Sequence, residues 1–329
     1  MKFSILLCAA VFLLFLFPRW DLPVYAADAP EGGVEESART KTLGVAAVQY
    51  TVKAERYGSL KKFSQSVEDL LASAVEMGAE VVVFPEYINV FLAFRKEMEA
   101  LSRAESIEEG LQMVGADSAG SLFMERSVEL RRVMDRIWGQ FARENSLWIV
   151  AGSYFAVEGD KLYNRSPVYG PSGELVYEQD KAALTPFEKD VLKLSPGRSE
   201  EADTFEVEGW DFALTICRDT FFDRWNTKFE DADVWIDIKA NGAEYTQQIE
   251  ELFEDALPER IEETEVPYGV TACLNGELLE LFWEGPSSII RWKKRGEKES
   301  DWEYIKRAKK EDREEVLVAE LRLPGDANN

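Results

Sequence analysis

The stretch of residues 43–84 constrains the fold more than any other part of this sequence. Residues 43–50 and 81–84 are almost continuously apolar, which is typical of buried strands. Between them, apolar residues recur at helical spacing over residues 60–74, and Gly78 supplies a stop signal. This order of strand, helix and strand predicts a layered α/β fold.

Further candidate strands continue this pattern through the chain. A second amphipathic helix is predicted at residues 130–141, and Pro171-Ser172-Gly173 indicates a hairpin turn. With no repeat and no linker, residues 43–322 are predicted to form one domain, preceded by a flexible leader at residues 27–42. The remaining predicted strands cover residues 147–151, 163–169, 175–179, 205–207, 212–216, 234–238, 269–273, 287–291 and 316–321.

Three of the predicted strands are followed by side chains that can take part in covalent chemistry, namely Glu86, Lys181 and Cys217. A thiol is a nucleophile, a carboxylate can accept its proton, and an ammonium group can stabilise negative charge. An ammonium group nearby also lowers the pKa of a thiol from about 8.5, so we expect Lys181 to favour a thiolate at Cys217. Each residue alone also fits a structural role, but together they predict a site at the strand ends.

The sequence contains no histidine among its 329 residues. This excludes Ser-His-Asp and Cys-His catalysis, HExxH zinc sites and proton transfer by imidazole. Metal binding would depend on carboxylates alone, and neither a GxGxxG nor a Walker A motif is present. We therefore expect a carboxylate or a lysine to be the base, with no metal and no cofactor.

The chain is strongly acidic, with a formal net charge of −24 at pH 7. Nucleic acid and anionic lipid bind basic surfaces, so this chain is a poor partner for either. The one basic run, residues 291–295, lies among acidic residues and fits an exposed hairpin. A small molecule is the expected ligand.

The first residues are typical of an export signal. Lys2 precedes an apolar run at residues 5–17, shorter than the roughly 20 residues that a membrane-spanning helix needs. Cleavage after Ala26 is expected, so residues 1–26 are predicted to be a signal peptide of an exported protein. Because Arg19-Trp20-Asp21 brings charge before this site, an uncleaved N-terminal anchor is the alternative.

Two cysteines remain after that cleavage, Cys217 and Cys273. A domain of this size can bury a sufficient core without a disulfide. Cys273 lies in an apolar run, so we interpret it as a small buried side chain. A bridge between the two cysteines would block the candidate nucleophile.

The ordered motifs resemble the nitrilase superfamily of carbon–nitrogen hydrolases. Phe-Pro-Glu ending at Glu86, Tyr-x-x-x-Lys-x-x-Leu around Lys181 and Ile-Cys-x-Asp around Cys217 follow one another in that family's order. The resemblance extends over about residues 43–322. Each short motif is weak by itself, whereas the ordered set is specific.

The resemblance implies a role for each of these residues. Cys217 would be the nucleophile, Glu86 the general base, and Lys181 would stabilise the oxyanion together with the backbone N–H of Arg218. Glu188 matches a second glutamate that many members place beside the lysine. The implied fold is a four-layer α-β-β-α sandwich, and a homo-oligomer is expected because family members commonly associate.

Two departures from the family bear on the substrate. Members that attack nitriles usually have Trp-Glu after the cysteine, whereas this chain has Arg218-Asp219, which favours an amide or carbamoyl-type C–N bond. Residues 91–125 form an unusually long insertion near Glu86, which we interpret either as a roof over the pocket or as surface packing. We expect an exported amidase-like hydrolase. The alternatives are an acyltransferase of the same fold and a catalytically silent exported binding protein.

Overall fold

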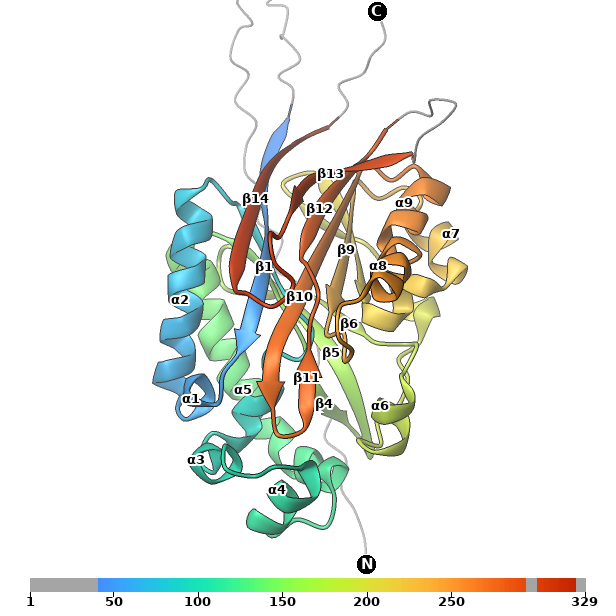
Figure 1. Ribbon diagram of the computed structural model, residues 1–329. Coiled ribbons are helices and arrows are strands. Elements are labelled where there is room, and N and C mark those ends of the chain that lie inside the picture. Colours follow the sequence, from blue (N-terminus) through green and yellow to red (C-terminus); the bar gives the residue numbers. More distant parts are fainter. Residues whose placement is uncertain (1–40, 294–300, 324–329) are drawn as a thin grey trace, which may run out of the picture. The chain divides into compact units, whose positions relative to one another are not determined.

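Two stacked halves of one continuous β-sheet form the centre of the computed structural model, which describes residues 41–293 and 301–323 (Figure 1). The halves join where the end of β1 (Thr42–Val52) pairs in parallel with β10 (Tyr268–Leu278), with Tyr50 opposite Leu274. The predicted signal peptide, residues 1–26, and residues 27–40 of the predicted leader lie outside the described residues.

The first half of the sheet is organised around β1. This strand pairs in parallel with β2 and antiparallel with β14, and β2 pairs in parallel with β3. β5 pairs antiparallel with β3, β4 and β6, and its pairing with β6 confirms the predicted hairpin. Besides β1, the strands of this half are β2 (Val81–Phe84), β3 (Trp148–Ala151), β4 (Tyr154–Glu158), β5 (Lys161–Tyr169), β6 (Leu175–Asp180) and β14 (Glu315–Arg322).

The second half of the sheet is organised around β9 and β10, which pair in parallel with each other. β8 pairs in parallel with β9, while β7, β11 and β12 add antiparallel pairs and β13 pairs with β12. Besides β10, the strands of this half are β7 (Phe205–Val207), β8 (Trp210–Ile216), β9 (Val234–Lys239), β11 (Leu281–Trp283), β12 (Ser288–Trp292) and β13 (Trp302–Arg307).

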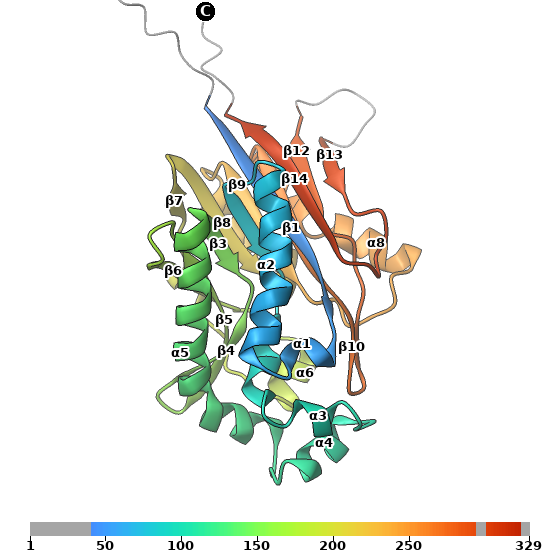
Figure 2. The ribbon, with the colours of Figure 1, turned by 90° about the vertical axis from the view of Figure 1, so that its left-hand side faces the viewer.

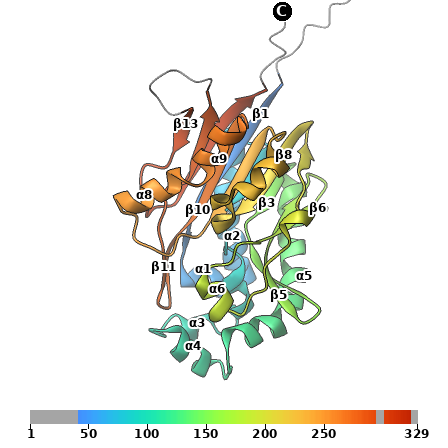
Figure 3. The ribbon, with the colours of Figure 1, turned by 90° about the vertical axis from the view of Figure 1, so that its right-hand side faces the viewer.

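Side chains alternate along these strands and so divide the apolar core into layers. In β1, Val45 and Ala47 pack between the two halves of the sheet, whereas Ala46 and Val48 face helices α2 and α5. On the outer face of the second half, α7 and α9 pack against β8 and β9. The result is the expected four-layer α-β-β-α sandwich, seen from its two helical sides in Figures 2 and 3.

Helices cover both outer faces and one end of this sandwich. The α-helices are α1 (Ala54–Tyr57), α2 (Leu60–Glu76), α3 (Met98–Leu101), α4 (Ile107–Met113), α5 (Ala119–Asn145), α6 (Pro186–Asp190), α7 (Asn226–Phe229), α8 (Gln247–Glu254) and α9 (Leu257–Thr264). The 3-10 helices are η1 (Val90–Phe94), η2 (Ser199–Glu201), η3 (Cys217–Phe221) and η4 (Asp223–Trp225).

The predicted helix at residues 130–141 lies in the C-terminal part of α5, so its predicted start was wrong. α5 begins at Ala119, because the side chain of Ser118 accepts a hydrogen bond from the N–H of Ser121 and caps the helix. The prediction also missed β4, β11, β13 and the helices α6 to α9. β12 and β13 form the hairpin expected around the basic run, although residues 294–300 lie outside the described residues.

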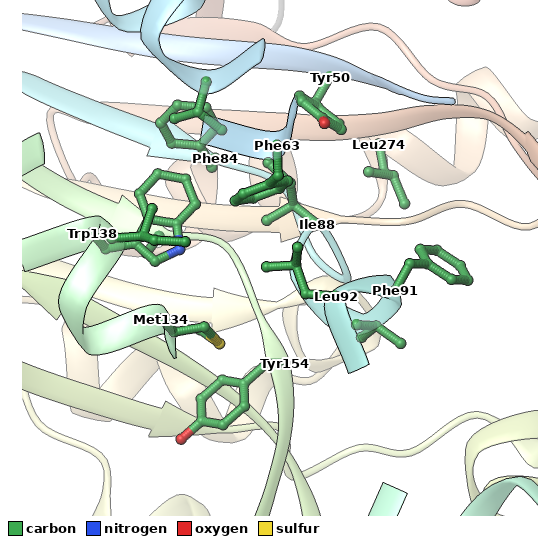
Figure 4. Packing of buried hydrophobic residues seen from close by; sticks show 14 of the residues in the cluster. Tyr50, Phe63, Phe84, Ile88, Phe91, Leu92, Met134, Trp138, Tyr154 and Leu274 are labelled. Carbon is green, nitrogen blue, oxygen red and sulfur yellow. The ribbon is translucent and has the colours of Figure 1, made fainter. Parts of the chain in front are cut away.

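An aromatic cluster supports the chain segment that follows β2 (Figure 4). The ring of Trp138 lies 4.9 Å from that of Phe84 and 6.1 Å from that of Phe63. Its indole N–H donates to Asn89 Oδ1 at 2.8 Å, and Asn89 in turn donates to the carbonyl of Ala151 at 2.7 Å. The turn that carries Glu86 is therefore held in place by packing against this aromatic cluster and by buried hydrogen bonds.

Parallel pairing places several strand ends at one edge of the sandwich. β2 and β3 run parallel to β1, and β8, β9 and β10 also share this direction. In Figure 1 the arrowheads of β1 and β10 point toward the end where α3 and α4 lie. Residues that follow these strands therefore meet at the end of the sandwich that α3 and α4 cover. In the part of the chain that the structure describes, no helix is both long and apolar enough to cross a membrane.

Candidate active site

Glu86, which lies just after β2, is held by groups from both halves of the sheet. Its Oε1 accepts hydrogen bonds from Lys181 Nζ and from Asn164 Nδ2, both at 2.8 Å. Its Oε2 accepts a hydrogen bond from the backbone N–H of Ala240, after β9, at 3.0 Å. The carboxylate is almost fully buried, so these contacts fix its orientation.

Lys181, directly after β6, lies between two carboxylates. Its Nζ is 2.8 Å from Glu86 Oε1 and 3.0 Å from Glu188 Oε1. Glu188 belongs to α6, where it forms a capping box with Thr185, and it also accepts a hydrogen bond from the hydroxyl of Tyr87 at 2.6 Å. The Lys181, Glu86 and Glu188 side chains are each at most 1% exposed, so the three predicted residues form one buried acid–lysine–acid cluster.

The three charges of this cluster do not balance, because one ammonium group faces two carboxyl groups. Burial raises the pKa of Glu86 to about 7, although Lys181 opposes the shift. Burial acts in the same direction on Glu188, but Lys181 and the hydrogen bond from Tyr87 hold the pKa of Glu188 below its usual value. Burial would lower the pKa of Lys181, yet its acidic neighbours raise it. Of the three groups, Glu86 is thus the one whose pKa lies near neutral pH.

Cys217 lies at the start of η3, directly after β8, with a positive φ of 53°. This left-handed backbone conformation is uncommon for residues other than glycine and is found often at functional sites. The N–H of Cys217 donates to Asp237 Oδ1 at 3.0 Å. Cys217 is unpaired, as is the buried Cys273, so the structure contains no bridge between them.

The expected thiolate at Cys217 is the one electrostatic prediction that was wrong. Cys217 is half-buried, but the loss of water around its sulfur, together with the nearby carboxylate of Glu86, raises the pKa of the thiol to about 12, and this outweighs the lowering effects of Lys181 and Lys239. The thiol is therefore protonated at neutral pH and needs a base to become nucleophilic.

A second buried ion pair lies near Cys217, and it was not identified from the sequence. Asp237 and Lys239 both lie on β9, and Lys239 Nζ is 2.6 Å from Asp237 Oδ2, with side-chain exposures of 4% and 0%. Lys239 also lies over the ring of Phe221 at 5.1 Å. An Asp and a Lys two residues apart in an otherwise apolar strand face the same side, and this spacing could have indicated the pair.

The Arg218-Asp219 pair after the cysteine links two loops of the site. Asp219 is fully buried and accepts hydrogen bonds from the backbone N–H groups of Ala182 at 3.1 Å and Ala183 at 2.6 Å. Arg218 is exposed and donates to the carbonyl of Leu184 at 2.7 Å. The loop after Lys181 is thereby tied to the loop after Cys217. The backbone N–H of Arg218, the predicted oxyanion donor, follows Cys217 at the start of η3.

Glu86, Lys181 and Cys217 line one cavity of about 480 Å³. Most of its walls are apolar, and many come from the insertion at residues 91–125, which includes η1, α3 and α4. This finding favours the roof over mere surface packing. In Figure 1, α3 and α4 lie together at this end of the sandwich, close to α6 and β11. Within the described residues, no cluster of three or more Cys, Asp or Glu has an arrangement that could hold a metal.

These observations define a class, namely an α-β-β-α sandwich with an acid–lysine–thiol site at its strand ends. A family model described as carbon–nitrogen hydrolase matches residues 44–251, so the chain belongs to the carbon–nitrogen hydrolase family and is a hydrolase of C–N bonds. The resemblance to the nitrilase superfamily is thus confirmed. No curated protein sequence shows significant similarity to this chain.

Several solved structures share the fold, among them structures of an amidase from Nesterenkonia sp. AN1. A double mutant in complex with acrylamide is 18% identical, with a TM-score of 0.61 over 88% of this chain and 93% of that chain. A mutant in which the acetamide moiety of fluoroacetamide is covalently added to the active-site cysteine is 18% identical, with a TM-score of 0.62 over 86% of this chain and 92% of that chain. At this level of identity the likeness shows the fold alone.

Proposed function

We propose that this protein is an amidase that hydrolyses an amide through a thioester on Cys217. The observation that carries the proposal is the buried Glu86–Lys181–Glu188 cluster in one cavity with an unpaired cysteine. The structurally similar amidase forms complexes with amides, among them acrylamide and butyramide, which supports the same substrate class. In this proposal Glu86, Lys181, Cys217 and Glu188 have the roles that the sequence resemblance implied.

The first half of the reaction forms the thioester. Glu86 takes the proton of the Cys217 thiol while the sulfur attacks the amide carbon, and an S–C bond forms. Negative charge then develops on the carbonyl oxygen, where Lys181 Nζ and the backbone N–H of Arg218 stabilise it. As the C–N bond breaks, Glu86 passes its proton to the nitrogen, and the neutral amine leaves.

The second half of the reaction regenerates the enzyme. Water attacks the thioester carbon while Glu86 takes one of its protons, the C–S bond breaks, and the proton returns to the sulfur. A carboxyl group with a pKa of about 7 suits both directions of this transfer, because it accepts and releases a proton near neutral pH. Glu188 keeps Lys181 charged and in place throughout.

The proposal is tested by measuring ammonia release from primary amides with the wild type and with Cys217→Ala. The wild type should release ammonia, and Cys217→Ala should have no activity above background while keeping its melting temperature within a few degrees. Turnover that survives in Cys217→Ala would contradict the thioester route. A stable fold that turns over no amide and leaves Cys217 unlabelled by a small thiol reagent would favour a binding protein.

Export of the protein and its homo-oligomeric state belong to the same proposal. The apolar run at residues 5–17 and the small residue Ala26 support secretion with removal of residues 1–26. Mass spectrometry of native material should find a mature protein that begins at Ala27. An intact N-terminus in a cytoplasmic fraction would contradict export.

A further inference from the structure

We propose that the substrate carries an apolar, medium-length acyl chain, which the cavity under residues 91–125 holds while its carbonyl carbon meets Cys217. This inference rests on the proposed function and names the substrate class of that same site. It draws on three features of the cavity, namely its size, its largely apolar walls and the carboxylate of Glu280 in its wall.

The size of the cavity exceeds what a short amide needs. Its volume of about 480 Å³ lies within the range of roughly 300–1,000 Å³ that is usual for drug-sized ligands. An acetyl or formyl group bound to Cys217 would leave most of this volume unfilled. A longer acyl chain would bury its surface there.

The walls away from the charged cluster offer apolar contacts. They include the rings of Phe91, Phe94, Phe123, Phe155 and Trp283. The Phe123 ring lies 5.0 Å from that of Phe94 and 4.7 Å from that of Phe155, so these rings brace one another. A polar acyl group would lose its hydration without gaining hydrogen bonds here, whereas each buried methylene adds favourable transfer energy.

A carboxylate joins the roof to the β10–β11 hairpin. Glu280, which also lines the cavity, accepts a hydrogen bond from the N–H of Ile107 at 3.3 Å. Together with the formal net charge of −24, this carboxylate disfavours an acyl chain that ends in a second carboxylate. An acyl group that is uncharged at its far end, as an alkyl chain is, is therefore favoured over one that ends in a carboxylate.

The apolar chain of the substrate belongs on the acyl side of the amide rather than on the amine side. The acyl group stays bonded to Cys217 through both halves of the reaction, so it can remain in the cavity throughout. The amine must leave before water can attack the thioester. An amine chain seated under the roof would have to leave the cavity before water could attack, whereas an acyl chain leaves only with the acid product at the end of the reaction.

A series of straight-chain amides from acetamide to octanamide tests this inference. We expect kcat/KM to rise about threefold to fourfold with each added methylene. Octanamide should also be preferred at least about 10-fold over the amide of the same length that ends in a carboxylate. A flat or falling series would overturn the inference while leaving the amidase proposal intact if acetamide is hydrolysed. A rise with N-alkyl acetamides in place of alkanamides would also overturn it.

A binding measurement keeps the test independent of turnover. Calorimetry with Cys217→Ala should show octanamide binding at least about 10-fold more tightly than butyramide. Equal affinities would overturn the acyl-chain inference even if no amide is hydrolysed. A wild-type enzyme that hydrolyses no amide, together with tight octanamide binding to Cys217→Ala, would instead contradict only the proposed function.

Two tryptophan substitutions on α4 provide a matched pair. Leu111 lines the cavity, whereas Met113 is 46% exposed and does not. Leu111→Trp should lower the ratio of kcat/KM for octanamide to that for acetamide by about 10-fold, because the indole fills space that the chain needs. Met113→Trp should leave this ratio unchanged. The same ratio in both variants would overturn the inference.

Discussion

Two lysines are buried close to Cys217, and their surroundings differ in one respect. Among the residues that the structure describes, Lys181 contacts the carboxyl groups of Glu86 and Glu188, whereas Lys239 forms an ion pair only with Asp237. The first cluster holds one more acid than base, and Glu86 therefore titrates near neutral pH. The second is a balanced pair with no spare group for proton transfer.

The difference indicates that the two clusters have different roles at the site, one in proton transfer and the other in positioning Cys217. An unbalanced buried cluster can move a proton, so it suits chemistry. A balanced buried pair is fixed, so it suits positioning, and Asp237 Oδ1 is the acceptor for the N–H of Cys217. We expect substitutions in the first cluster to lower kcat strongly or to shift the pH dependence of the reaction. Substitutions in the second cluster should lower kcat only modestly.

Within the two clusters, the largest effect should come from removing the carboxylate that we propose as the base. Glu86→Gln keeps the shape of the side chain but cannot accept the thiol proton, so kcat should fall by about 10²–10⁴-fold. Steady-state ammonia release on a folded sample measures this. A rate near that of the wild type would exclude Glu86 as the base.

Removing one lysine at a time compares the clusters directly. Lys181→Met removes the proposed oxyanion donor and leaves two buried carboxyl groups, so kcat should fall by about 10²–10³-fold. Lys239→Met is the matched control, and we expect a loss of about 10-fold or less. Melting temperatures are measured alongside, because breaking either buried pair can destabilise the fold by about 3–5 kcal/mol. Equal losses of activity in two folded variants would contradict the division of roles.

The pH profile should report the unbalanced cluster. Since the protonated form of Glu86 cannot accept the thiol proton, kcat/KM should fall as the pH drops through about 7, by up to tenfold per pH unit. The chain has no histidine whose titration could cause this fall in kcat/KM. The Glu188→Gln variant removes one negative charge, so its midpoint should move to lower pH. A rate that stays constant from pH 8 to pH 5 would count against Glu86.

The smallest effect should come from Asp237. Asp237→Asn keeps an oxygen for the N–H of Cys217, so its kcat should stay within about 10-fold of the wild type, whereas Asp237→Ala should lose more. Neither variant should move the midpoint of the pH profile, because positioning does not change the base. A shifted midpoint would assign Asp237 to proton transfer instead.

Much of the sandwich could be predicted from periodicity. Strands such as β1 and β2 are apolar on both faces because each is buried on both sides, and such runs stand out in a sequence. β13 was harder to predict, since its side chains are only partly buried or exposed and its pattern is mixed. The Thr185-Pro186-Phe187-Glu188 segment carries a capping box and a proline at the helix start, a local signal that could have indicated α6.

The site could be predicted only in part from the same kinds of signal. Ordered motifs and strand ends indicated Glu86, Lys181, Cys217 and Glu188, and the structure brings Glu86, Lys181 and Glu188 into hydrogen-bonding contact. The shift of the thiol pKa was predicted with the wrong sign, because burial outweighs the lysine and a sequence does not reveal how deeply a side chain lies. Asn164 was missed because a single amide in a strand carries no distinctive pattern.

The central claim is that the amide carbonyl carbon becomes bonded to Cys217. Peptide mapping by mass spectrometry after rapid quenching of the enzyme with a primary amide tests this most directly. The account predicts an acyl group on Cys217, none on the buried Cys273, and a burst of ammonia that matches the acylated fraction. Ammonia release without any adduct on Cys217, or an adduct confined to Cys273, would contradict it.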